Sequence, residues 1–170
     1  MKRQWGPSAP AAQIAGAFVG QSFSKVLVVT DFSDTANSAI PFAFALAGPT
    51  TQVHLVHVVE HDEVPNPLYA HYSSDDFSDP DKRRELVAKV EAHLRTLVPA
   101  DARKVQTECA VAFHREIAPG IVAEAQARGV DVIVIGSHGR TGLAHLLMGS
   151  VAEYILRNSD IPVLIVPHRP

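Results

Sequence analysis

The sequence predicts an α/β protein with five parallel strands and helices on both faces of the sheet. Short runs rich in Val and Ile alternate with segments of helical periodicity along the chain. Most of these runs are continuously apolar, which is typical of strands buried on both faces. Strands that alternate with helices favour right-handed crossovers and a parallel sheet. A chain of 170 residues suits one such domain.

Five segments have the composition of strands and are bounded by polar residues, Gly or Pro. Three of them are continuous apolar runs, the second in chain order is apolar except for two His, and the third alternates between polar and apolar residues. The predicted strands are residues 25–30, 53–59, 105–113, 131–136 and 162–166.

The first predicted helix follows the first strand directly. Ser33 or Asp34 can cap its start, and the helical pattern extends to about Ala47. Gly48-Pro49 should end it. Pro41 lies inside the segment and should kink the helix or delay its start.

Three further helices are predicted between the remaining strands. Asp79 or Asp81 begins the clearest one, whose apolar residues recur on one face up to residue 98. The next spans 117–128 and should end at Gly129. The last begins near residues 149–150 and ends near residue 158.

Composition excludes several classes of protein. Fifteen Lys and Arg residues against eighteen Asp and Glu residues give a net charge of −3, which argues against a nucleic-acid partner. One Cys excludes an internal disulfide framework. No run is long enough to span a membrane. We therefore expect a cytoplasmic protein with no membrane partner.

The chain divides into a short arm and one domain. Residues 1–24 are rich in Pro, Ala, Gly and Ser, and we expect a flexible N-terminal arm rather than a signal peptide, since no clear cleavage site follows the apolar part. Residues 25–168 should form the domain. The segment from His61 to Ser78 has no periodicity and reads as a long loop after the second strand.

The residues after the strands are candidates for a binding site, because ligands of open parallel sheets bind beyond the carboxyl ends of the strands. Thr30 and Asp31 follow the first strand, and a glycine-rich segment from Gly136 to Gly142 follows the fourth. Such glycines permit close approach of phosphate oxygens. Gly149-Ser150 then begins a helix, whose N-terminus favours an anion. The alternative is a glycine-rich connection that only turns the chain.

The spacing of these residues resembles a known signature. Gly136-x-x-Gly139, nine residues and then Gly149-Ser150 is similar to the ATP-binding signature of the universal stress proteins. The resemblance extends to the segments 28–33, 57–58 and 149–153 and to the final strand, and covers about residues 25–167. The sequence matches neither a Walker P-loop nor a dinucleotide-binding motif.

The resemblance implies a flavodoxin-like three-layer sandwich, related to the adenine-nucleotide α-hydrolase-like folds, with a nucleotide across the strand tips. It places Asp31 near the adenosine and the backbone of Val58 against adenine. The implied nucleotide-binding residues are Thr30, Asp31, Val58, Ile135, Gly136, His138, Gly139, Arg140, Gly149, Ser150 and Val151. The alternative role of Asp31 is that of a helix-capping acid.

We expect binding of ATP, or of AMP or ADP, with little or no turnover, as in a stress-response switch. No catalytic residue is identified, because His138 has no recognisable catalytic partner and is better placed to contact a phosphate. No metal site is expected beyond Mg²⁺ that arrives with ATP, which Asp31 could contact. The alternatives are a slow ATPase or phosphotransferase that uses His138 or Ser150, a nucleotide-free homodimeric module, and an FMN site.

Other reactive side chains are expected to be structural. His54 and His57 should point to opposite faces of their strand, so they cannot chelate a metal together. The histidines as a group should lie on the surface, with one or two inside. Cys109 should be buried and inert. By resemblance, the last strand, from Ile161 to Val166, is a sheet edge that pairs two subunits in a homodimer.

Overall fold

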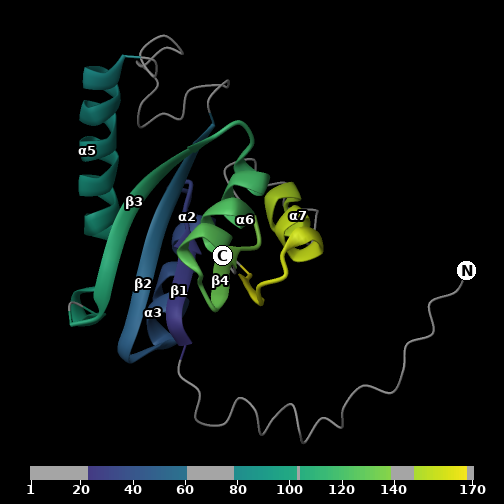
Figure 1. The fold of residues 1–170 in the computed structure, drawn as a ribbon. Coiled ribbons are helices and arrows are strands. Elements are labelled where there is room, and N and C mark those ends of the chain that lie inside the picture. The colour runs from purple at the N-terminus through teal and green to yellow at the C-terminus, as the bar shows by residue number, and fades with distance from the viewer. Residues whose placement is uncertain (1–22, 61–78, 103, 139–147, 168–170) are drawn as a thin grey trace, which may run out of the picture.

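The computed structural model describes residues 23–60, 79–102, 104–138 and 148–167 (Figure 1). The N-terminal arm (except Phe23 and Ser24) and the long loop, both expected from the sequence, lie outside these residues. The described elements, in chain order, are β1 (Phe23–Val29), α2 (Asp34–Asn37), α3 (Ile40–Ala45), β2 (Ala47–Glu60), α5 (Pro80–Leu97), a 3₁₀ turn (Ala100–Ala102), β3 (Gln106–His114), α6 (Ile117–Arg128), β4 (Val132–Gly136), α7 (Ser150–Asn158) and β5 (Val163–Val166).

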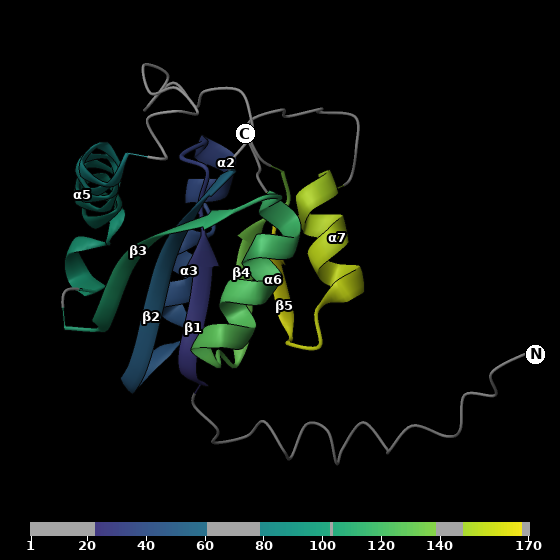
Figure 2. The same ribbon diagram turned by 45° about the horizontal axis from the view of Figure 1, so that its top comes forward.

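The five strands form one parallel sheet in the order β3-β2-β1-β4-β5. In Figures 1 and 2, α6 and α7 lie on one face of the sheet, and α2, α3 and α5 lie on the other. The predicted α/β fold of three layers is therefore confirmed. The chain crosses from one face to the other after β3, because the next strand, β4, pairs on the far side of β1.

Each face of the sheet has its own apolar core. Residues at alternate positions of β1 belong to different clusters: Val26 and Val28 pack toward α3 and α5, whereas Leu27 and Val29 pack toward α6 and α7. Their side chains are at most 5% exposed. A strand buried on both faces has no face exposed to solvent, which is the physical reason for its continuously apolar sequence.

The first helix and the second strand differ from the prediction. The segment that was expected to be one helix up to Ala47 forms two short helices, and Pro41 lies in the first turn of the second one, α3. Ala47 already belongs to β2, so Gly48-Pro49 lie inside a strand rather than after a helix. The β1–β2 register shifts between Phe23 and Lys25, which gives β2 the extra residues of a bulge, a position that accepts Pro.

The other helix ends agree with the sequence. Asp79 caps α5, and its carboxylate accepts from the backbone N–H groups of Asp81 and Lys82. Gly129 ends α6 in the left-handed conformation, with φ of 62°. Within the described residues, no helix has both the length and the apolar character needed to cross a membrane.

Candidate functional site

Three of the predicted segments meet at one end of the sheet. β1 and β4 pair through Val28 and Val134, so their carboxyl ends are neighbours. Val58 lies on β2, the other neighbour of β1. Because Val29 pairs with Val56, Val58 is level with residue 31. The structure thus brings Thr30, Asp31, Val58, Ile135 and Gly136 together at the strand tips.

The start of α7 is attached to the end of β4. The backbone N–H of Gly149 donates to the carbonyl oxygen of Ser137 over 2.7 Å, and the N–H of Ser137 donates to Val166 over 2.8 Å. Gly149 is the N-cap of α7, and among the described residues no side chain caps this helix. The N–H groups at its first turn, around Ser150 and Val151, are those that an anion would accept from.

Gly136 lies against the backbone of α2. A Cβ atom at this position would lie 2.7 Å from the carbonyl oxygen of Thr35 and 3.0 Å from the Cα atom of Ala36. The close approach requires glycine whether or not a ligand binds beside it. It also places α2, which begins at Asp34 shortly after Asp31, on the tip of β4.

The carboxylate of Asp31 is oriented by Ser33. Its Oδ1 atom accepts from the backbone N–H of Ser33 over 3.0 Å and from the Ser33 hydroxyl over 2.6 Å. Ser33 Oγ in turn accepts from the N–H of Ala36 and is the N-cap of α2. The alternative that Asp31 is itself the helix cap is therefore wrong: it supports the cap from outside the helix.

Sequence reasoning missed the residues that hold this turn. Thr30 donates its hydroxyl to Asn37 Oδ1 over 2.7 Å and accepts the N–H of Phe32 over 2.9 Å. Its carbonyl oxygen lies 2.8 Å from Nδ1 of His57, which is buried. Phe32 has a φ of 69°. No spacing in the sequence indicates these contacts, because they depend on how α2 and β2 pack around the end of β1.

The remaining predicted site residues divide into two groups. His138 is the second residue after β4, and its Nδ1 atom lies 3.0 Å from the hydroxyl of the buried Ser137. Gly139 and Arg140 lie outside the described residues. Among the described residues, no group of three or more His, Cys, Asp and Glu side chains could hold a metal ion.

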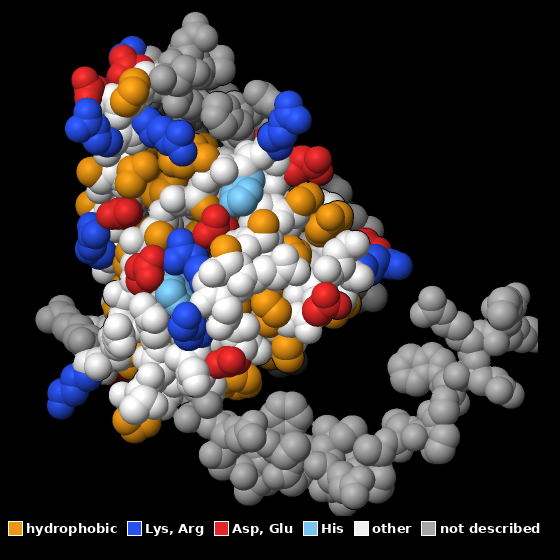
Figure 3. Space-filling model, viewed as in Figure 1, with side chains coloured by type: hydrophobic (Ala, Val, Ile, Leu, Met, Phe, Trp, Pro, Cys, Tyr) orange, Lys and Arg blue, Asp and Glu red, His pale blue; other side chains and the backbone are white. Residues whose placement is uncertain are grey.

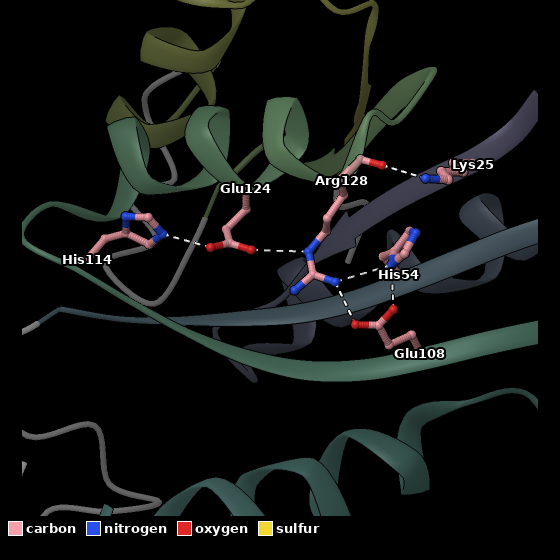
Figure 4. A network of polar contacts seen from close by, with 6 residues as sticks. All are labelled: Lys25, His54, Glu108, His114, Glu124 and Arg128. Carbon is pink, nitrogen blue, oxygen red and sulfur yellow. Dashed lines mark hydrogen bonds and ion pairs between the residues drawn. The ribbon is translucent and has the colours of Figure 1, made fainter.

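A second polar cluster lies away from the strand tips, between α6, β2 and β3. Figure 3 shows acidic, basic and histidine side chains gathered over this region, and Figure 4 shows how they connect. Arg128 is at its centre: Nη1 lies 2.7 Å from Glu108 Oε1, and Nε donates to Glu124 Oε2 over 3.1 Å. The cluster is completed by Lys25, whose ammonium donates to the Arg128 carbonyl, and by His54 and His114. It links the edge strand β3 to α6.

His54 and His57 lie on opposite faces of β2, as predicted, but both are buried. His54 Nδ1 lies 3.2 Å from Glu108 Oε2, whereas its Nε2 atom is buried and has no hydrogen-bond partner among the described residues. Cys109 is half-buried, and burial raises the pKa of its thiol, which disfavours the reactive thiolate.

We expect the stability of the fold to fall as the pH drops below about 6.5, the ordinary pKa of histidine. Burial lowers the pKa of His54, and the charges of Arg128 and Lys25 act in the same direction, against the opposing effect of Glu108. The unfolded chain therefore binds this proton at a higher pH than the folded chain does, and acid favours unfolding. Urea denaturation at pH 7.5, 6.5 and 5.5 measures the effect.

The variant His54→Asn tests the origin of this pH dependence, since Asn is a polar side chain of similar shape that does not titrate. The free energy of unfolding of the variant should change less between pH 6.5 and pH 5.5 than that of the parent. An equal change in both proteins would contradict the assignment to His54.

The comparisons with known proteins agree with this fold. The family model of the universal stress protein family matches residues 22–167. Universal stress protein MJ0577 of Methanocaldococcus jannaschii is 30% identical over 160 residues, which cover 86% of this chain and 96% of that protein. Its solved structure superposes with a TM-score of 0.68 at 26% identity and covers 88% of this chain and 99% of that one. The chain belongs to the universal stress protein family.

Two more distant structures share the fold and contain nucleotides. A universal stress protein in complex with cAMP has a TM-score of 0.59 at 20% identity and covers 88% of this chain and 100% of that one. A universal stress protein family protein from Arabidopsis thaliana with AMP bound has a TM-score of 0.52 at 14% identity, over 86% of this chain and 92% of that one.

Proposed function

We propose that this chain binds an adenine nucleotide, in the first place ATP, at the tips of β1 and β4. The observation that carries the proposal is the start of α7, which no side chain of the described residues caps and which is attached to the end of β4, next to the end of β1. Helix N–H groups suit phosphate oxygens, and a carboxylate suits ribose hydroxyl groups. The nucleotides bound by two members of the same fold support the choice of ligand.

The arrangement suits binding better than turnover. Hydrolysis of ATP needs a group that orients the attacking water, and a metal ion that neutralises charge on the phosphates. Nδ1 of His138 lies 3.0 Å from the Ser137 hydroxyl, and among the described residues no group of three or more His, Cys, Asp and Glu side chains could hold a metal ion. Mg²⁺ would therefore arrive with the nucleotide, and the protein would respond to occupancy as a switch. Its cytoplasmic location stays a prediction.

Calorimetry and thermal unfolding with Mg-ATP test the proposal. A ligand at a hundredfold excess over its Kd stabilises the folded state by about 2.7 kcal/mol, so the melting temperature should rise. The variant Gly149→Glu places a carboxylate where we expect phosphate and should abolish the shift. The control Asn158→Glu adds the same charge at the exposed far end of α7 and should keep it.

The other candidate functions predict different results. Turnover of ATP above the rate in buffer alone, lost in His138→Ala, would favour the slow ATPase. Absence of any effect of millimolar ATP, AMP or ADP on the parent would contradict nucleotide binding and favour an interaction module that does not use nucleotide.

We also propose that the protein forms a homodimer through β5. This strand is at the end of the sheet, beyond β4, and Leu164 on it is 36% exposed. The neighbouring helix α7 exposes Leu156 and Tyr154. An apolar edge strand favours pairing with a second copy, because its backbone N–H and C=O groups lack strand partners on one side.

A further inference from the structure

We infer that Phe32 is a positioning residue of the proposed nucleotide site, which acts by holding the carboxylate of Asp31 at the strand tips. Phe32 does not need to touch the ligand for this role. Its aromatic ring keeps the turn after β1 in a conformation that a bulky residue otherwise avoids. The inference rests on the proposed nucleotide binding and adds to it the residue on which the site geometry depends.

The backbone of Phe32 is in an unfavourable conformation. Its φ of 69° is the only positive value at a residue other than glycine in the described part of the chain. A side chain with a Cβ atom is strained in this region, and more so when it is bulky. Strained backbone of this kind persists only where its surroundings enforce it, and it is concentrated at functional sites.

The surroundings that enforce it come from three elements. The Phe32 ring contacts two imidazoles, with centroid distances of 4.6 Å to His57 of β2 and 4.9 Å to His93 of α5. Its N–H donates to the hydroxyl of Thr30, and its carbonyl oxygen accepts from Asn37 Nδ2 over 3.3 Å. The ring is thus held by contacts with two elements, and the peptide groups on either side of it are held by hydrogen bonds.

The consequence for Asp31 follows from the chain. Asp31 lies between Thr30, whose carbonyl oxygen is held by His57, and Phe32, and its own Oδ1 is held by Ser33. If the ring is removed, the backbone at position 32 can relax to a negative φ, which rotates the peptide groups on either side. The carboxylate then leaves the position that Ser33 gives it at the strand tips. Binding energy that depends on Asp31 is lost while the sheet remains intact.

Calorimetric titration of the full chain with Mg-ATP, well below the melting temperature, tests the inference. Phe32→Ala should weaken binding about tenfold, and Phe32→Tyr should restore it, because the tyrosine ring can contact the same imidazoles. His93→Ala removes one side of the contact without changing Phe32 and should give a smaller loss. The matched control is Phe42→Ala, an exposed aromatic residue of α3, which should bind as the parent does.

A double-mutant cycle separates positioning from a general structural role. If Phe32 acts through Asp31, the double variant with Phe32→Ala and Asp31→Asn should bind Mg-ATP only slightly more weakly than the weaker of the two single variants. The inference would be overturned if the increase in Kd of the double variant were the product of the increases in the two single variants. A Kd of Phe32→Ala equal to that of the parent would also overturn it. These results leave nucleotide binding itself intact. A parent protein that binds no nucleotide would instead overturn the proposed function and the inference together.

Discussion

The variant Gly136→Ala is expected to lower the free energy of unfolding by about 3 kcal/mol. The added methyl group would lie 2.7 Å from the carbonyl oxygen of Thr35 and 3.1 Å from its carbonyl carbon, both of which are backbone atoms. No rotation of a side chain can relieve such a contact. Either β4, which is buried and paired on both sides, or α2 must move.

The same variant should also weaken nucleotide binding. The N-cap of α2 is Ser33, which holds Asp31, so a displacement of α2 from β4 moves the carboxylate with it. Urea denaturation and titration with Mg-ATP measure the two effects separately.

Gly129→Ala is the matched control for this prediction. This glycine has a φ of 62°, but no atom lies within 4 Å of the position of an added Cβ. Its substitution therefore has a conformational cost alone, about 1 kcal/mol, and should leave nucleotide affinity unchanged. Equal losses of stability at both glycines would contradict the steric argument for Gly136.

The second large effect is expected at Arg128, where Arg128→Met should lower the free energy of unfolding by about 2–3 kcal/mol. The side chain of Arg128 is 19% exposed and that of its partner Glu124 is 20% exposed. Methionine keeps the apolar stem but leaves the carboxylates of Glu124 and Glu108 without their guanidinium donor. Among the described residues, Glu124 would keep only its contact with His114, and Glu108 only its contact with His54. The loss of the charged partner of a half-buried carboxylate is more costly than the pair is favourable.

An exposed ion pair offers the control. Arg157 and Glu153 on α7 are separated by four residues, as are Arg128 and Glu124, but their side chains are 73% and 49% exposed. Arg157→Met should change stability by less than about 0.5 kcal/mol, because solvent screens the pair. The prediction at Arg128 fails if the two substitutions have the same effect in urea denaturation.

The removal of Arg128 should also change the response to acid. A hydrogen bond from Arg128 is the main reason why the pKa of Glu108 lies below its ordinary value of 4.5, with a smaller contribution from His54. Glu108 therefore stabilises the fold above its ordinary pKa, and this contribution is lost as the pH falls through its lowered pKa. In Arg128→Met, the loss of stability below pH 4.5 should be smaller.

Much of the architecture could be predicted from local sequence. The runs that form β1 and β4 are continuously apolar because both faces of these strands are buried, and this property is readable without knowing their neighbours. Gly129 and Asp79 were correctly placed at helix ends because a cap depends on a few adjacent residues. The predicted start of β2 was wrong, because the bulge that accommodates Gly48-Pro49 depends on how β2 pairs with β1.

Only part of the candidate site could be predicted from the sequence. The spacing from Gly136 to Ser150 indicated which loops follow the strands, and the parallel order of β1 and β4 placed those loops together. The closeness of Gly136 to Thr35 and the contact of Phe32 with His93 join residues 60 to 100 positions apart. They arise from the angle and depth at which α2 and α5 pack on the sheet.

The sequence by itself determined the class of fold, the strands and the segment that carries the glycine and serine signature. These follow from hydrophobic periodicity and turn chemistry, which act over a few residues. Only the tertiary structure decided that Phe32 adopts a positive φ, that His57 holds the carbonyl oxygen of Thr30, and that Arg128 joins β3 to α6. Such features depend on the free energy of contacts between distant segments, and these contacts exist only once the chain has folded.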